Sequence, residues 1–157
     1  MVAKAQAELQ SRYGRIDHES ELILFDFTDY YGPEMGEGLL RKFVSFEALI
    51  DPSRIVDIKI ETNAIEERLG ALPDGKLHRR VNLDPGYVAP SRLVLATTKD
   101  FSHRIYLDKG IYAEVTLNFT RNGCTYHPWT FPDYKSGKYT EFFLKVRHVL
   151  LEKQKSK

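Results

Sequence analysis

Apolar residues recur at helical spacing near both ends of the chain and once in its middle. The first stripe consists of Val2, Ala5, Leu9 and Tyr13. Because Gly14 directly follows this stripe, it is well placed to end the helix. The closing segment from Tyr139 to Leu150 is amphipathic in the same way, and it predicts a C-terminal helix.

A helix is also predicted over 51–70, although part of that segment alternates as a strand would. Asp51 followed by Pro52 is typical of a helix start, because an aspartate caps free N–H groups and proline suits the first turn. Residues 56–61 alternate strictly between apolar and polar positions. The helical spacing nevertheless continues to Leu69, so we predict a helix here rather than a strand.

Strands are indicated by short apolar or alternating runs bounded by turn residues. These runs are 21–27, 39–46, 79–83 and the pair 103–107 and 111–120, and the apolar run 91–98 fits either a helix or a strand. The first run has apolar residues on both faces, which is typical of a strand covered on both sides. This order of elements predicts an α+β fold, a mainly antiparallel sheet with helices packed on it, in one domain over residues 1–157.

The last two strands form a predicted hairpin, and its register can be counted outward from the turn. A three-residue loop over 108–110 gives the facing pairs Leu107–Ile111, Tyr106–Tyr112, Ile105–Ala113 and Arg104–Glu114. The face with Ile105 is then expected to be the core. On the other face, Arg104 and Glu114 form either a cross-strand ion pair or part of a site in which a guanidinium beside two phenols binds a carboxylate or phosphate.

The composition is typical of a folded cytoplasmic domain rather than of a disordered or exported protein. The chain has 157 residues, 42% of them hydrophobic, with 23 Lys and Arg against 22 Asp and Glu. Such a chain can bury a core without disulfides or a metal, and its balanced charge is unlike that of a disordered tail. A formal net charge of +1 provides no general attraction to DNA or to a membrane surface. The single cysteine, Cys124, and an N-terminus without an apolar signal core predict a cytoplasmic protein.

Charge is distributed unevenly along the chain. Residues 16–40 hold seven acidic residues and no Lys or Arg, whereas residues 76–109 hold seven basic residues and three acidic ones. The two segments either attract one another or expose separate charged faces. In the acidic segment, Asp26 and Asp29 lie at the end of an apolar run. We expect these carboxylates to be capped, paired with arginine, or bound to a hard cation such as Mg²⁺.

The basic segment brings together residue types that suit an anionic ligand. The candidates are Asn82, Asp84, Lys99, His103 and Arg104. Lys99 and Arg104, with Asn82, would bind the anion, while Asp84 and His103 would orient the ligand or transfer protons as catalytic residues. His103 has an alternative role as a histidine hydrogen-bonded at the edge of the core.

An aromatic loop between Tyr126 and Tyr134 either covers a sheet edge or stacks on bases or a bound peptide. The sequence contains no P-loop, no glycine-rich dinucleotide motif and no nucleophile elbow. Cys124 and His127 provide only half of a zinc site. None of these motifs therefore identifies an activity.

Several stretches together resemble a known family. They are Phe25–Tyr31, Glu34–Gly36, Phe43–Glu47, Val81–Tyr87, Leu95–Asp100, His103–Tyr106, Tyr112–Leu117, Trp129–Tyr134, Phe142–Phe143 and Val146–Arg147. In this combination, spread over nearly the whole chain, they are similar to the family called domain of unknown function 4416. The resemblance implies a small cytoplasmic prokaryotic protein without an established activity. It also implies a further apolar strand before the first helix, which would make the fold a ferredoxin-like split β-α-β unit lacking its first strand here, with a hairpin and helix appended.

The leading functional hypothesis is a protein that binds a small phosphorylated or anionic ligand, such as a nucleotide or sugar phosphate, with phosphoryl-transfer or hydrolytic chemistry as an extension. The alternative is a non-catalytic interaction domain that binds protein or RNA through its aromatic loop and basic face. No membrane or DNA partner is expected. A homodimer is one way to complete a sheet that lacks its first strand.

Overall fold

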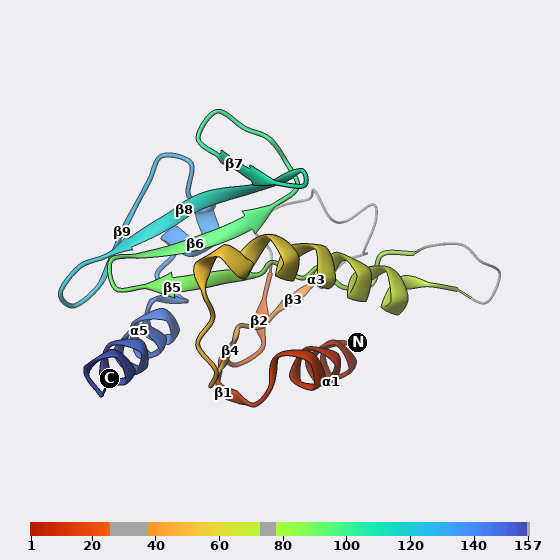
Figure 1. The fold of residues 1–157 in the computed structure, drawn as a ribbon, viewed down its shortest axis with the longest axis horizontal. Helices are drawn as coiled ribbons and strands as arrows, with labels where there is room; N and C mark the ends of the chain where they lie inside the picture. Colours follow the sequence, from red (N-terminus) through yellow and green to blue (C-terminus); the bar gives the residue numbers. More distant parts are fainter. Residues whose placement is uncertain (26–37, 73–77, 157) are drawn as a thin grey trace. The chain divides into compact units, whose positions relative to one another are not determined.

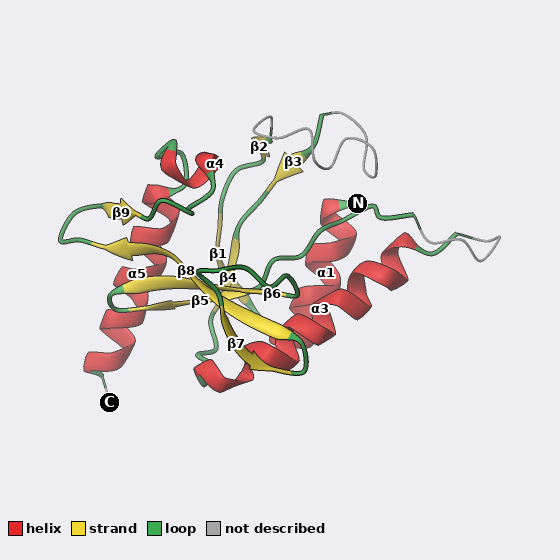
Figure 2. Ribbon diagram, turned by 90° about the horizontal axis from the view of Figure 1, so that it is seen from above, coloured by secondary structure: helices red, strands yellow, loops and turns green. Residues whose placement is uncertain are grey.

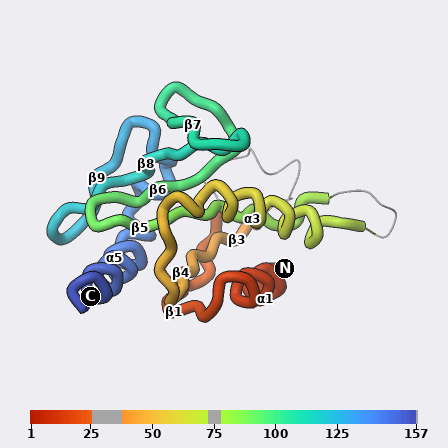
Figure 3. The backbone as a smooth tube through the Cα atoms, viewed as in Figure 1, coloured from red at the N-terminus to blue at the C-terminus, as the bar shows by residue number. Residues whose placement is uncertain are grey.

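The structure is a computed structural model that describes residues 1–25, 38–72 and 78–156 (Figure 1). The chain forms two compact units. The first unit comprises Met1–Ile50 and Ile60–Leu83, and the second comprises Asp51–Lys59 and Asp84–Lys157. Figure 3 traces the backbone from the red N-terminal helix to the blue C-terminal helix.

The first unit begins with helix α1, Val2–Tyr13, as its apolar stripe predicted. Gly14 ends the helix with a positive φ of 89°, and its N–H donates to the Gln10 carbonyl. The last turn is attached to the middle of the chain, because the Tyr13 hydroxyl donates to Glu61 Oε2 at 2.9 Å. Burial, together with this hydrogen bond, raises the pKa of Tyr13. Helix α1 therefore packs through its C-terminal end as well as through its apolar stripe.

The strands of the first unit are shorter than the sequence predicted. Strand β1, Ile16–Glu19, pairs antiparallel with β4, Val44–Phe46. Strand β2, Ile23–Leu24, pairs antiparallel with β3, Leu40–Arg41. The predicted strand over 39–46 is thus two separate strands, and β1 was not predicted.

The segment expected to be a strand covered on both faces is not one in its described part. Leu22 is 53% exposed and Leu24 is 54% exposed. The face of this segment that carries Leu22 and Leu24 is therefore exposed, although its residues are apolar. Phe25 is partly buried and bears the Arg41 guanidinium 4.1 Å from its ring centroid. Residues 26 and 27 of the predicted strand lie outside the described residues.

The helix predicted over 51–70 is confirmed. A 3₁₀ turn, η1, spans Pro52–Arg54, and helix α3 spans Ile55–Gly70. Asp51 caps the start, since its Oδ1 accepts a hydrogen bond from the Ser53 N–H at 2.8 Å. The alternation over 56–61 had suggested a strand, but the cap and the continued helical spacing determine the local structure.

The strand predicted over 79–83 is wrong, because the structure assigns no regular element there. The backbone N–H of Leu83 donates to Glu66 Oε1 at 2.6 Å, and Arg79 donates to Asn82 Oδ1. The Glu66 side chain of helix α3 thus accepts a hydrogen bond from a backbone N–H that a sheet partner would otherwise bond.

A five-stranded antiparallel sheet dominates the second unit (Figure 2). Its strands are β5, Gly86–Ala89; β6, Arg92–Thr97; β7, Ile105–Asp108; β8, Ile111–Phe119; and β9, Cys124–Tyr126. The order is β5-β6-β8-β7, and β9 also pairs with β8. The ambiguous run 91–98 is therefore a strand.

The sheet carries helices, as expected for an α+β fold. Ile55 and Val56, at the start of α3, form a buried cluster with Ala96 and Ile111, and Tyr87 packs against it. Helix α4, Pro132–Lys135, and helix α5, Thr140–Lys155, complete the unit, and α5 contacts β5. The α+β class is confirmed, whereas the ferredoxin-like arrangement is not. No helix in the described part of the chain is both long and apolar enough to cross a membrane.

The hairpin register agrees with the prediction except at the turn. Tyr106 faces Tyr112, but Asp108 rather than residue 107 faces Ile111. The turn is consequently two residues long, and Lys109 and Gly110 have φ values of 50° and 76°, as a type I′ hairpin turn requires. A bulge before Asp108 absorbs the extra residue.

Candidate functional site

The candidate site is built around Glu114 in strand β8, whose side chain is only 3% exposed. Its Oε2 atom lies 2.8 Å from His103 Nε2 and 2.9 Å from Arg104 Nε. An ionised carboxylate only accepts hydrogen bonds, so both nitrogens act as donors. The two donor side chains are themselves 12% and 11% exposed. The predicted Arg104–Glu114 ion pair is confirmed, and it is largely buried.

The strand pairing explains why Glu114 is buried. On one side of β8, strand β7 pairs only as far as Ala113, and β9 begins to pair at Leu117. Within the described residues no strand occupies the interval between them. Side chains of the aromatic loop instead form hydrogen bonds with the backbone of this interval. Trp129 Nε1 donates to the Val115 carbonyl at 3.0 Å, and Thr130 Oγ1 donates to the Thr116 carbonyl. The aromatic loop therefore covers a sheet edge, as one of its two predicted roles proposed.

Aromatic rings surround the His103 side chain. The imidazoles of His103 and His127 each stack on Trp129, with ring centroids 5.0 Å and 4.6 Å from it. Phe101 contacts His103 at a centroid distance of 5.4 Å. Trp129 is 38% exposed. The aromatic cluster therefore extends from His103, which contacts the buried Glu114 carboxylate, to the protein surface.

Several buried polar atoms of this region have no hydrogen-bond partner in the described part of the chain. They are Glu114 Oε1, Thr116 Oγ1 and His127 Nε2. A buried polar group without a partner costs about 1–3 kcal/mol, and more if it is charged. Unsatisfied groups are rare in native interiors, so neighbouring ones indicate a place for a bound polar molecule or water.

Lys99 and Arg104, which the sequence proposed as ligands of an anion, are joined through the Lys99 backbone. Arg104 Nη1 donates to the Lys99 carbonyl at 3.0 Å, and the Lys99 N–H donates to Thr97 Oγ1 at 3.2 Å. The Lys99 residue itself is exposed. The His103 and Arg104 side chains therefore contact one buried carboxylate, and the backbone of Lys99 contacts Arg104.

Asp84 takes part in a different contact. Its Oδ1 lies 3.9 Å from Nζ of Lys59, a residue that is only 5% exposed. Asp84 precedes β5, and His103 precedes β7, so the strand order puts three strand spacings, about 14 Å, between the two strands. The carboxylate that accepts the His103 hydrogen bond is therefore Glu114.

Three of the predicted site residues remain, namely Asn82, Asp26 and Asp29. Asn82 belongs to the first unit, where it accepts a hydrogen bond from Arg79. Asp26 and Asp29, the proposed cation ligands, lie outside the described residues. Among the residues that the structure describes, no group of three or more His, Cys, Asp or Glu side chains is arranged to hold a metal ion.

Sequence reasoning missed the importance of Glu114 and Lys59 for different reasons. Glu114 was recognised only as a partner for Arg104, because strand alternation says which residues share a face but not whether that face is covered. Lys59 falls in the alternating stretch of α3, where a lysine is normally exposed.

Comparison with curated proteins finds no match, and comparison with solved structures finds none either. The sequence model of the family described as Domain of unknown function (DUF4416) matches residues 1–149. The matched range includes every residue of the candidate site described above. The chain therefore belongs to the DUF4416 family.

Proposed function

We propose that this protein binds a small phosphorylated or anionic ligand, such as a nucleotide or sugar phosphate, at the site around Glu114. The observation that carries the proposal is the state of that carboxylate: it is buried, one oxygen is held by His103 and Arg104, and the other has no described partner. Glu114 Oε1 can accept a hydrogen bond, and a sugar hydroxyl or an amino group of the ligand would donate it.

The anionic end of the ligand would be bound by the cations next to this carboxylate. Glu114 offsets the charge of Arg104, so the anion would be bound by the remaining N–H donors of Arg104 together with the Lys99 ammonium group. Arg104 uses Nε and Nη1 for Glu114 and the Lys99 carbonyl. Its position is thereby set in advance, which lowers the entropy cost of binding.

The same geometry supports a proton-transfer role for His103. Because Nε2 donates to Glu114, Nδ1 of the neutral ring carries the lone pair. A histidine held by a carboxylate in this way can act as a general base toward a bound hydroxyl or water. Hydrolysis or phosphoryl transfer is thus a reasonable extension of the binding proposal. Asp84 as a second acid–base residue, and Mg²⁺ at Asp26 and Asp29, belong to the same hypothesis.

One observation favours the second candidate function, a non-catalytic interaction domain. Phe101, Ile105 and Tyr106 are 63%, 67% and 57% exposed, and β7 is the end strand of its sheet. Exposed apolar residues on a strand edge are typical of surfaces that bind other chains. Ile105 was expected in the core, and that expectation is wrong because the structure leaves its face of β7 uncovered.

A thermal-shift panel tests the proposal. Nucleotides and sugar phosphates are added singly, with and without Mg²⁺, to the full chain and to the variants Glu114→Gln and His103→Gln. A ligand at 100 times its Kd adds about 2.7 kcal/mol to stability, so the wild type should show a clear rise in Tm. We expect the rise to be clearly smaller in Glu114→Gln than in the wild type, and unchanged in the control Glu47→Gln, whose carboxylate is 53% exposed.

Two results would count against the ligand proposal. The first is the absence of any shift over the whole panel. The second is an equal shift in the wild type and in both site variants, because binding would then occur elsewhere. If the panel is silent and substitution of Ile105 by serine abolishes binding to a protein or RNA partner, the interaction-domain alternative is favoured.

A further inference from the structure

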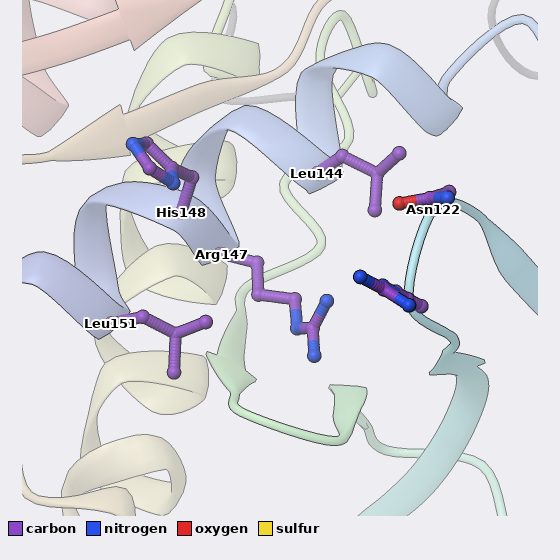
Figure 4. A pocket seen from close by; sticks show the side chains of 6 residues that line it. Asn122, Leu144, Arg147, His148 and Leu151 are labelled. Atoms are coloured by element: carbon purple, nitrogen blue, oxygen red, sulfur yellow. The ribbon is translucent and has the colours of Figure 1, made fainter.

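The second unit also contains a groove of about 420 Å³, which lies between helix α5 and the turn that joins β8 to β9 (Figure 4). It is lined by Arg121, Asn122, Leu144, Arg147, His148 and Leu151. This volume lies within the range of small-molecule sites. None of the lining residues is acidic. The groove is thus cationic on its polar side and aliphatic on the other.

Uncharged groups form the described contacts of the Arg147 side chain in this groove. Its Nε donates to the Pro90 carbonyl at 2.7 Å, and its Nη1 donates to the Thr120 carbonyl at 3.0 Å. The guanidinium also lies 5.3 Å from the ring centroid of Phe119. No described carboxylate forms an ion pair with Arg147, in contrast to Arg104 at the Glu114 site. Its positive charge is therefore positioned without being neutralised.

The remaining lining residues add recognition of two kinds. Arg121, the Asn122 amide and His148 provide further hydrogen-bond donors. Leu144 and Leu151 are seven residues apart on α5, which places both on the same face of the helix. A bare inorganic anion would leave these leucines without a partner.

We propose that this groove binds an organic phosphate monoester, with the phosphate on Arg121 and Arg147 and the organic part on Leu144 and Leu151. Two guanidinium groups suit a phosphate, because its several oxygens accept paired N–H donors from more than one direction. The groove is separate from the Glu114 site, and this inference does not depend on the function proposed above.

The test is a titration of phenyl phosphate into ¹⁵N-labelled full-length protein, followed by NMR. Inorganic phosphate and phenol are titrated in parallel. We expect saturable shifts confined to residues 119–123 and 144–151, tighter binding of phenyl phosphate than of either half, and weaker binding at higher salt. Arg121→Gln should raise the Kd about tenfold, the effect of losing one charge-assisted hydrogen bond.

Matched variants keep the test decisive. Arg54→Gln removes an exposed arginine of the same unit that does not line the groove, and it should leave the Kd within about twofold. His148→Gln provides a second groove variant, so a folding defect in one does not decide the outcome. Glu114→Gln should leave phenyl phosphate binding at the groove intact, which separates this inference from the proposed function.

Three results would overturn the proposal. Phenol binding as tightly as phenyl phosphate would show an apolar hollow without anion recognition. An equal loss of affinity in Arg54→Gln and Arg121→Gln would show general attraction to a basic surface. Shifts that do not saturate, or that leave residues 119–123 and 144–151 unaffected, would show that the groove is not the site.

Discussion

Replacing Glu114 by glutamine is the most informative single perturbation, because it removes one charge and keeps the shape of the side chain. In the folded protein the Glu114 carboxylate receives hydrogen bonds from His103 and Arg104, and its side chain is 3% exposed. The substitution leaves the Arg104 guanidinium, 11% exposed, without its counter-charge. We therefore expect Glu114→Gln to destabilise the fold.

The size of the effect follows from these burials. Removing one partner of a buried ion pair costs about 3–5 kcal/mol. The glutamine oxygen can still accept one of the two hydrogen bonds, which puts the expected loss near 3 kcal/mol. The unsatisfied Oε1 position brings no compensation, since the amide places an equally unpartnered group there. For a chain of this length a loss of about 3 kcal/mol corresponds to a decrease of about 6–12 °C in Tm.

Urea denaturation and thermal melting measure this loss directly. The control is Glu47→Gln, because Glu47 also pairs with an arginine, Arg15, but these side chains are 53% and 70% exposed. Exposed pairs contribute little, so the control should melt almost as the wild type does. A double-mutant cycle with Arg104→Gln should give a coupling energy of at least about 1 kcal/mol. Equal melting of Glu114→Gln and the control would refute the buried-pair interpretation.

Three further predictions follow from other parts of the chain. Gly86→Ala should destabilise the sheet by about 1–3 kcal/mol or more in urea denaturation, because an added Cβ would overlap the Val94 carbonyl oxygen; an unchanged midpoint would contradict this packing. Asp51 accepts hydrogen bonds from Ser53, which lower the pKa of the carboxyl group. Its contribution to stability should be present at neutral pH and lost as the pH falls through about 4 and then through the lower folded pKa, so that Asp51→Asn flattens the acid limb of a pH–stability curve; parallel curves would speak against the cap. Burial raises the pKa of the Cys124 thiol, so the folded protein at pH 8 should react with a disulfide reagent more slowly than the protein in urea; equal rates would show that the thiol is not shielded.

The elements that the sequence predicted well are those with strong local signals. Helix α1 ends at Gly14, and η1 with α3 begins after Asp51, because capping residues act within a single turn. The Tyr106–Tyr112 register of the hairpin follows from a short loop with glycine at a positive φ. The Arg104–Glu114 pair was predictable from that register alone.

The predictions that were wrong depended on tertiary packing, which the apolar pattern along the chain does not report. Residues 79–83 resemble a strand, yet Glu66 of α3 bonds the Leu83 N–H. Ile105 was assigned to the core by alternation, yet it is 67% exposed. Alternation reports which residues share a face of a strand, but the neighbours that cover that face come from distant segments.

The sequence by itself determined the α+β class, the principal helices, the hairpin, and the grouping of Lys99, His103 and Arg104, because each depends on residues close together in the chain. Only the tertiary structure decided that Glu114 is buried and that one of its oxygens lacks a described partner. That result depends on an interval between β7 and β9 that the Trp129 loop covers. The burial of a charge depends on which surfaces meet in space, and no local pattern along the chain encodes that.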